Sequence, residues 1–306
     1  MEIKVISAVP AVRAWLDGSR STPGRTQQLW ESLVVEPYWN DLTKWAPFDQ
    51  SFKKPKMITD TAALNQQLDL LDTYSINDLA ETFNDIAEML PIHDDDPILV
   101  VIFPLDNSDT VAREKQNGVI GTTIFGNIML QINPLAPDWK AWIPFVFAHE
   151  YHHNVWGNHW YAIRGGQGIT GSLLEMLITE GQADIFAQSL YPELIPQWNR
   201  PLPPEVASRL ADQLSRDLES TDQGVHAKWL FGNEETGIPW CSGYAIGSEL
   251  ITAYLARNPD ITTQTLIETP ATTIYATSVK PAGCDSDSQV GESHNRSRRP
   301  LSPRLE

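Results

Sequence analysis

The chain has 306 residues, of which 42% are hydrophobic, and carries a formal net charge of −17. This length and composition suit a globular protein with one large domain or two small ones. The negative charge disfavours nucleic acids and anionic membranes as partners, because both bind basic surfaces. With only Cys241 and Cys284, the chain has neither a disulfide framework nor a thiolate metal site. No membrane-spanning run or signal peptide is recognisable, which favours a cytoplasmic protein.

The N-terminal part of the chain is mixed in character. Residues 1–57 contain short amphipathic stretches interrupted by prolines, and no chemistry can be assigned to them. Apolar residues then recur at helical spacing over 61–71 and over 76–90. Ser75 or Asn77 suits the N-cap of the second of these helices.

Strands and further helices are expected in the rest of the chain. Apolar runs rich in β-branched residues predict strands at 98–103, 119–125 and 128–132. Gly126-Asn127 is expected to form the two-residue turn between the last two. The strand at 128–132 could offer its edge to an extended peptide, although an ordinary place in the sheet core explains it equally well. Helical periodicity returns later at 173–190, 205–218 and 242–256, and a loop is expected over 229–239.

The strongest chemical signal is the motif H-E-x-x-H at residues 149–153. On a helix His149 and His153 lie on one face, so both imidazoles can bind one metal ion. Glu150 then lies close enough to act on a water bound to that ion, as zinc-assisted hydrolysis requires. A helix that is merely histidine-rich is the alternative. Pro144 suits the first helical position and Gly157 suits the C-terminal stop.

Two residues compete to be the third ligand of a zinc ion. His159 has the offset from His153 of the third histidine in the metzincin pattern. That pattern needs a glycine where this chain has Trp156, which would be strained at a positive φ. Glu180 is the alternative, and Asp184 lies one helical turn after it on the same face. One carboxylate can bind the metal while the other accepts the second N–H of a ligating histidine, so we favour Glu180.

Small residues accompany these two carboxylates in the sequence. Gly181, Ala183 and Ala187 would let their helix pack closely against the motif helix. Two solvated carboxylates on an amphipathic helix would explain the acids, but not the small residues beside them.

The motifs resemble those of the YjaZ-like predicted zinc-dependent proteases, a bacterial family. The resemblance rests on H-E-x-x-H at 149–153 with E-G-x-A-D at 180–184. It continues in W-L-F-G at 229–232, in Pro239 and in G-Y-x-x-G at 243–247. It implies a zincin-like α+β fold, in which a small, mostly antiparallel sheet packs on the motif helix before a mainly helical second half. The implied glutamate zincin site has His149, His153 and Glu180 as ligands, Glu150 as general base, and Asp184 orienting a histidine.

An oxyanion-stabilising residue is also expected in such an enzyme. Tyr244 begins a predicted helix after a loop, where its phenol could reach a cleft and donate to a developing oxyanion. A tyrosine packed against a helix is the simpler interpretation, and His226 is a second candidate for the same role.

The sequence therefore predicts three parts, namely an unassigned segment 1–57, a zincin-like metallopeptidase domain 58–280, and a disordered tail 281–306. We expect a Zn²⁺-dependent peptidase that acts on peptides or proteins. The alternatives are a metal-stabilised binding or chaperone-like protein, and a zinc hydrolase of non-peptide amides or esters. Glu150 separates the first alternative from an enzyme, because a purely structural zinc site does not need it.

Overall fold

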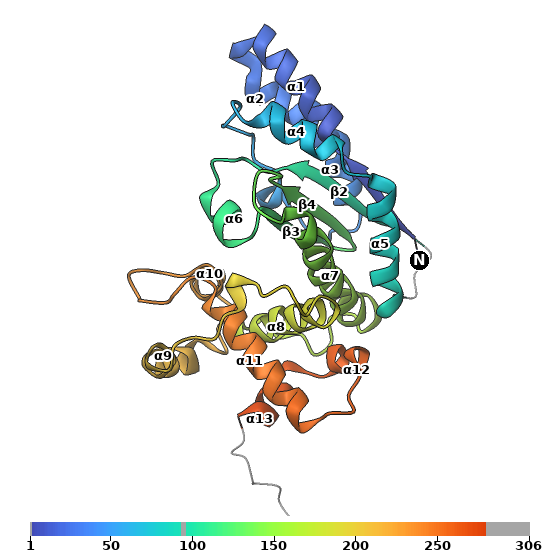
Figure 1. The fold of residues 1–306 in the computed structure, drawn as a ribbon. Coiled ribbons are helices and arrows are strands. Elements are labelled where there is room, and N and C mark those ends of the chain that lie inside the picture. Colours follow the sequence, from blue (N-terminus) through green and yellow to red (C-terminus); the bar gives the residue numbers. More distant parts are fainter. Residues whose placement is uncertain (1, 93–95, 280–306) are drawn as a thin grey trace, which may run out of the picture.

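A four-stranded sheet lies at the centre of the N-terminal half. The computed structural model describes residues 2–92 and 96–279 (Figure 1). The strands are β1 (Ile3–Ser7), β2 (Ile98–Pro104), β3 (Val119–Ile124) and β4 (Asn127–Ile132), in the order β1-β2-β4-β3. β1 pairs with β2 and β2 with β4 in parallel, whereas β3 and β4 are antiparallel. The α+β class is thus confirmed, but the expectation of a mostly antiparallel sheet is wrong, because it left out β1 and the crossover from β2 to β4.

The β3–β4 hairpin forms the edge of this sheet opposite β1. Its closing pair is Ile124 and Asn127, so the two-residue turn is Phe125-Gly126, one residue earlier than predicted. Both turn residues have positive φ, 40° at Phe125 and 94° at Gly126, as hairpins of this length favour. β4 lies between β2 and β3. The strand directly before the motif helix is therefore an inner strand, and the edge next to this helix belongs to β3.

The N-terminal segment is built into the same core. β1 supplies an edge strand, and Trp15 and Trp30 are buried in the core with their rings edge to face and their ring centroids 5.0 Å apart. In Figure 1 helices of this segment cover the end of the sheet farthest from the second half. Its helical elements are α1 (Val9–Ser21), η1 (Pro23–Arg25), α2 (Thr26–Trp30), η2 (Glu31–Val35), α3 (Glu36–Leu42) and η3 (Ser51–Lys53).

Helices α4 (Leu64–Asp72), α5 (Ile76–Met89) and α6 (Thr110–Lys115) complete this half. The first two agree with the predicted helices. The Ser75 hydroxyl accepts a hydrogen bond from the Asp78 amide, which confirms Ser75 as the N-cap of α5.

The motif helix is longer than its sequence signals indicated. α7 (Trp139–Gly157) begins five residues before Pro144, which lies inside the helix. The helix does not stop at Gly157 either, because a π-helical turn, η4 (Asn158–Ile163), continues it directly. α7 is buried on nearly all sides, as suits a helix packed between the sheet and the second half (Figure 1).

The second half is helical. Helix α8 (Leu173–Leu190) has the predicted bounds, and the predicted loop over 229–239 is wrong at its start, since the buried Trp229 belongs to α10 (Gln223–Phe231). Gly181 of α8 faces α11 (Ser242–Arg257), where an added Cβ would lie 2.7 Å from the Ser248 nitrogen, rather than facing α7 as expected. None of the helices within residues 2–92 and 96–279 is long and apolar enough to cross a membrane. The predicted tail lies outside the described residues. The helices are α8 (Leu173–Leu190), η5 (Gln197–Asn199), α9 (Pro204–Asp217), α10 (Gln223–Phe231), α11 (Ser242–Arg257), α12 (Thr263–Glu268) and α13 (Ala271–Ser278).

Candidate metal centre

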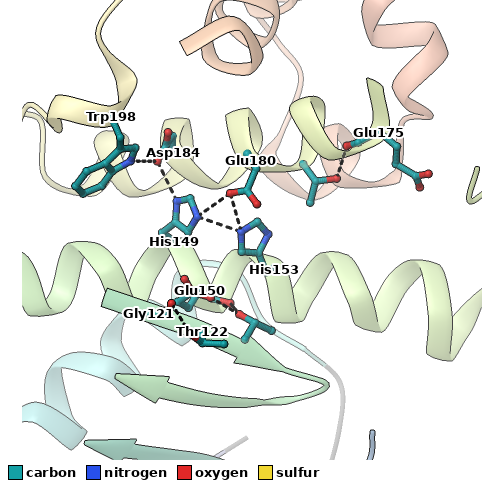
Figure 2. A network of polar contacts seen from close by, with 11 residues as sticks. Gly121, Thr122, His149, Glu150, His153, Glu175, Glu180, Asp184 and Trp198 are labelled. Carbon is teal, nitrogen blue, oxygen red and sulfur yellow. Dashed lines mark hydrogen bonds and ion pairs between the residues drawn. The ribbon is translucent and has the colours of Figure 1, made fainter. Parts of the chain in front are cut away.

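Three side chains from α7 and α8 converge between these helices (Figure 2). The Nε2 atoms of His149 and His153 lie 3.0 Å apart. Oε2 of Glu180 lies 3.2 Å from the Nε2 of His149 and 3.3 Å from that of His153. One ligand atom from each of the three residues lies within 4.8 Å of the other two. The structure thus brings together the three residues that the sequence proposed as ligands.

The chemistry of this donor set fits a zinc ion. Two imidazole nitrogens point at each other and share one carboxylate oxygen, an arrangement that a cation between them would satisfy. Two histidines and one glutamate are a ligand set of catalytic zinc sites, which leave a further position for water. All three side chains are largely shielded from solvent, so few waters compete for them.

A buried carboxylate orients the first histidine. Asp184 is fully buried, and its Oδ1 accepts from the Nδ1–H of His149 at 2.9 Å and from the Nε1–H of Trp198 at 3.1 Å. With its proton on Nδ1, His149 presents the lone pair of Nε2 to the cluster. Trp198 was missed because it lies on η5, in a proline-rich stretch without a recognisable motif.

The cluster is electrostatically prepared for a positive charge. Burial lowers the pKa of His149, but its hydrogen bonds to Asp184 and Glu180 outweigh burial and raise that pKa well above its ordinary value. Burial raises the pKa of Glu180, but His153 and His149 outweigh this and hold it far below the usual range. A metal ion must therefore displace a proton from this cluster.

Glu150 lies about 100° round α7 from His149 and points toward β3. The Thr123 hydroxyl donates to Oε2 of Glu150 at 2.6 Å and lies 2.9 Å from its main-chain oxygen. A Cβ added at Gly121 would lie 2.6 Å from Oε1 and 2.7 Å from Cδ of Glu150. Gly121 thus leaves the space that the carboxylate occupies. Sequence reasoning missed both β3 residues, although a glycine inside a strand is a signal of close approach.

Tyr244 lies in the first turn of α11, facing the cluster. Its ring centroid is 6.3 Å from that of His149. Burial, together with the charge of Glu180, raises the pKa of Tyr244 well above its usual value, so its hydroxyl keeps its proton. Among the described residues this hydroxyl has no hydrogen-bond partner. It is a free donor near the cluster.

The other histidines in the described part of the chain lie elsewhere. His159 lies on η4, and its Nδ1 is 3.9 Å from Oε1 of Glu268 rather than in the cluster. His226 places its Nε2 2.8 Å from the carbonyl oxygen of Ser220, at the junction of α9 and α10. His152 is buried outside the cluster, with no hydrogen bond to either ring nitrogen among the described residues.

Comparison with known proteins identifies the family. Residues 76–276, well over half of the chain, match the family described as "Predicted Zn-dependent protease (DUF2268)". The match includes α7 with its motif, Glu180, and the β3 residues that surround Glu150. Searches of curated proteins and of solved structures gave no match. The chain therefore belongs to this family of predicted zinc-dependent proteases.

Proposed function

We propose that the protein is a zinc-dependent peptidase of the glutamate zincin type, with His149, His153 and Glu180 as the zinc ligands. The observation that carries the proposal is the convergence of these three side chains beside a glutamate that is not among them. Glu150 is held toward β3 instead, in a buried position that a purely structural zinc site would not require.

The protein groups around the cluster suit hydrolysis. A zinc ion bound there would activate a water molecule and polarise the carbonyl of the scissile bond. Glu150 accepts the proton of the attacking water and passes it to the leaving amine. Thr123 occupies Oε2 of Glu150, which leaves Oε1 for this transfer. Asp184 keeps His149 in the tautomer that binds metal.

Tyr244 is the proposed oxyanion-stabilising residue. Its hydroxyl is protonated and free to donate, and its ring lies beside that of His149. A hydrogen bond from this group to the carbonyl oxygen would strengthen as negative charge develops there. Tyr244→Phe should lower kcat by about 10²-fold, the usual effect of losing one such donor, while zinc is retained.

The free edge of β3 suits an extended peptide. Its outward-facing main-chain groups lie beside Glu150, so a peptide could add to the sheet there with its scissile bond near that residue. We therefore propose peptides or unfolded stretches of proteins as substrates.

The test compares the zinc-loaded wild type with Glu150→Gln. The variant should keep one zinc per chain, because Glu150 is not a ligand, and lose at least about 10²-fold in peptide hydrolysis. Zinc content is measured by elemental mass spectrometry, and hydrolysis with peptides, simple amides and esters. A Glu150→Gln variant with the wild-type rate would contradict the proposal. A zinc-loaded wild type that cleaves only esters or amides would point to a non-peptide hydrolase, and one that cleaves nothing to a binding protein.

A further inference from the structure

A lysine from the N-terminal segment reaches the centre of the proposed site. Lys53 is the last residue of η3 and lies outside the residues matched by the family. Its Nζ donates to the main-chain oxygen of Thr123 at 2.9 Å. Thr123 is also the residue whose hydroxyl holds Glu150. The Lys53 ammonium therefore lies at the edge of β3, where Thr123 links it to Glu150, the proposed general base.

This ammonium lacks a counter-ion of its own. Lys53 is half-buried, and burial lowers its pKa, an effect that the charge of Glu150 only partly opposes. Among the described residues no carboxylate lies within ion-pair distance of it, whereas the next residue, Lys54, pairs with Glu31. An ammonium has three N–H donors, and protein oxygen occupies one of them here. The unused donors are available to an anion, whose charge would offset the cost of this partial burial.

The register of the hairpin shows which main-chain groups of β3 a bound peptide would meet beside this ammonium. Residues 118, 120, 122 and 124 bond to β4; the Gly118 oxygen, for example, accepts from the Asn133 amide at 2.7 Å. The main-chain groups of Gly121 and Thr123 consequently point away from the sheet. A peptide that pairs with this edge must pass Lys53, which already occupies the Thr123 oxygen.

The direction of such a peptide identifies the part of it that meets Lys53. An antiparallel strand pairs slightly more stably than a parallel one, and a strand antiparallel to β3 would enter beside Thr123 and leave beside Val119. Glu150 lies against Gly121 and Thr123, which places the scissile bond near them. The residues on the N-terminal side of this bond therefore lie nearest to Lys53.

We infer that Lys53 binds a carboxylate of the substrate, so that the enzyme prefers peptides with an acidic residue just before the scissile bond. The inference rests on the proposed function and specifies its substrate class. A carboxylate could come from an Asp or Glu side chain or from the C-terminus of a short peptide. The antiparallel direction favours the side chain, because the C-terminus of the peptide lies toward Val119.

The first experiment maps cleavage sites in a peptide library made from a digested proteome. The zinc-loaded enzymes are the wild type, Lys53→Gln and the control Lys56→Gln, and the products are identified by mass spectrometry. Lys53→Gln removes the charge but keeps a donor for the Thr123 oxygen. Lys56 is exposed, so its variant removes the same charge without that contact. Acidic residues should be enriched within three positions before the cut for the wild type and Lys56→Gln, and not for Lys53→Gln.

Matched peptides then give the size of the effect and the source of the carboxylate. One pair differs by Glu or Gln before the cut, and each is made with a free and an amidated C-terminus. We expect kcat/KM to favour the Glu peptide by about tenfold in the wild type, to show no preference in Lys53→Gln, and to invert in Lys53→Glu. Dependence on the free C-terminus instead would make that terminus the ligand. An equal fall in kcat for all four peptides would overturn the inference, because Lys53 would then act only on Thr123 and Glu150.

A binding measurement separates this inference from the proposed hydrolysis. Fluorescein-labelled octapeptides of alanine with one Glu or Gln are titrated into zinc-loaded Glu150→Gln, with and without Lys53→Gln, and followed by fluorescence anisotropy. Tighter binding of the Glu peptide that requires Lys53 would support the carboxylate site even if the wild type cleaves nothing. Peptide hydrolysis without any preference that depends on Lys53 would leave the proposed function standing and refute the carboxylate site. Thermal unfolding of each variant checks that it is folded.

Discussion

The metal centre and the N-terminal segment contribute to one site in different ways. The centre consists of two helices, and its residues follow helical spacing, with His149 and His153 on α7 and Glu180 and Asp184 on α8. The N-terminal segment has no such pattern, yet it supplies β1 to the sheet and Lys53 to the edge of β3. A short motif thus locates the proposed chemistry, whereas its surroundings come from parts of the chain far from the motif.

The attachment of the segment is correspondingly long-range. The Asp106 carboxylate, just beyond β2, accepts from the amide and the hydroxyl of Thr59, both at 2.6 Å. These bonds anchor the chain shortly after Lys53. The position of the lysine therefore depends on the same sheet that supports α7.

Among the changes that test this comparison, removing a zinc ligand should have the largest effect on zinc binding and activity. Glu180→Ala takes away the carboxylate that both histidines share and should abolish stoichiometric zinc binding, and hydrolysis with it. His159→Ala is the matched control, since His159 faces Glu268 and should keep its zinc. Elemental mass spectrometry after dialysis measures both. Loss of zinc from His159→Ala alone would make the site metzincin-like and refute our pairing of α7 with α8.

A methyl group on β3 should have the next largest effect. In Gly121→Ala the new Cβ would collide with the Glu150 carboxylate and displace it. The ligands lie on another face of α7, so zinc should stay bound while kcat falls by about 10²-fold, the usual result of misplacing a catalytic group by about 1 Å.

The control for this variant is Gly157→Ala at the end of α7. A Cβ at Gly157 meets no other atom within 4 Å, so activity and zinc content should stay at wild-type values. Wild-type activity in Gly121→Ala would mean that Glu150 does not need its place against β3. The proposed general base would then be in doubt, although the metal centre would not.

The parts of the structure that sequence could predict are those determined by local spacing. The helix spacing of His149 with His153, and of Glu180 with Asp184, is visible in the sequence, and so are the bounds of α8. The partnership of the two helices was inferred by combining these two patterns. Local signals failed where packing overrides them, as at Pro144, which is accommodated inside a helix buried on nearly all sides.

The parts that could not be predicted depend on contacts between distant residues. β1 pairs in parallel with β2, and Ile3 lies opposite Ile98. A five-residue strand has no sequence feature that identifies so remote a partner. Trp198 on η5 and Lys53 on η3 lie on short helical turns whose positions depend on the whole fold. These residues distinguish the site of this chain from the motif alone, and their contribution can be recognised only in a three-dimensional structure.

The smallest expected effect concerns the anchor of the N-terminal segment. Burial raises the pKa of Asp106, but hydrogen bonds from Thr59 and Ser108 outweigh burial and lower it to about 2. Because the folded-state value lies below the unfolded value of about 3.9, the ionised carboxylate stabilises the fold above about pH 4. That contribution is lost as the pH falls through about 2. Asp106→Asn should therefore unfold at lower urea than the wild type at pH 6, and the difference should shrink toward pH 2.5.

Solvent exposure limits this difference to less than about 1 kcal/mol, so the urea midpoint is the quantity to compare across pH. Asp212→Asn, an exposed change on α9, controls for the loss of one negative charge. If the difference between Asp106→Asn and the wild type did not change with pH, ionisation of Asp106 would not be what anchors the segment. By loosening the chain that carries Lys53, Asp106→Asn should also weaken the preference for acidic peptides at pH 6, where the carboxylates of these peptides are ionised.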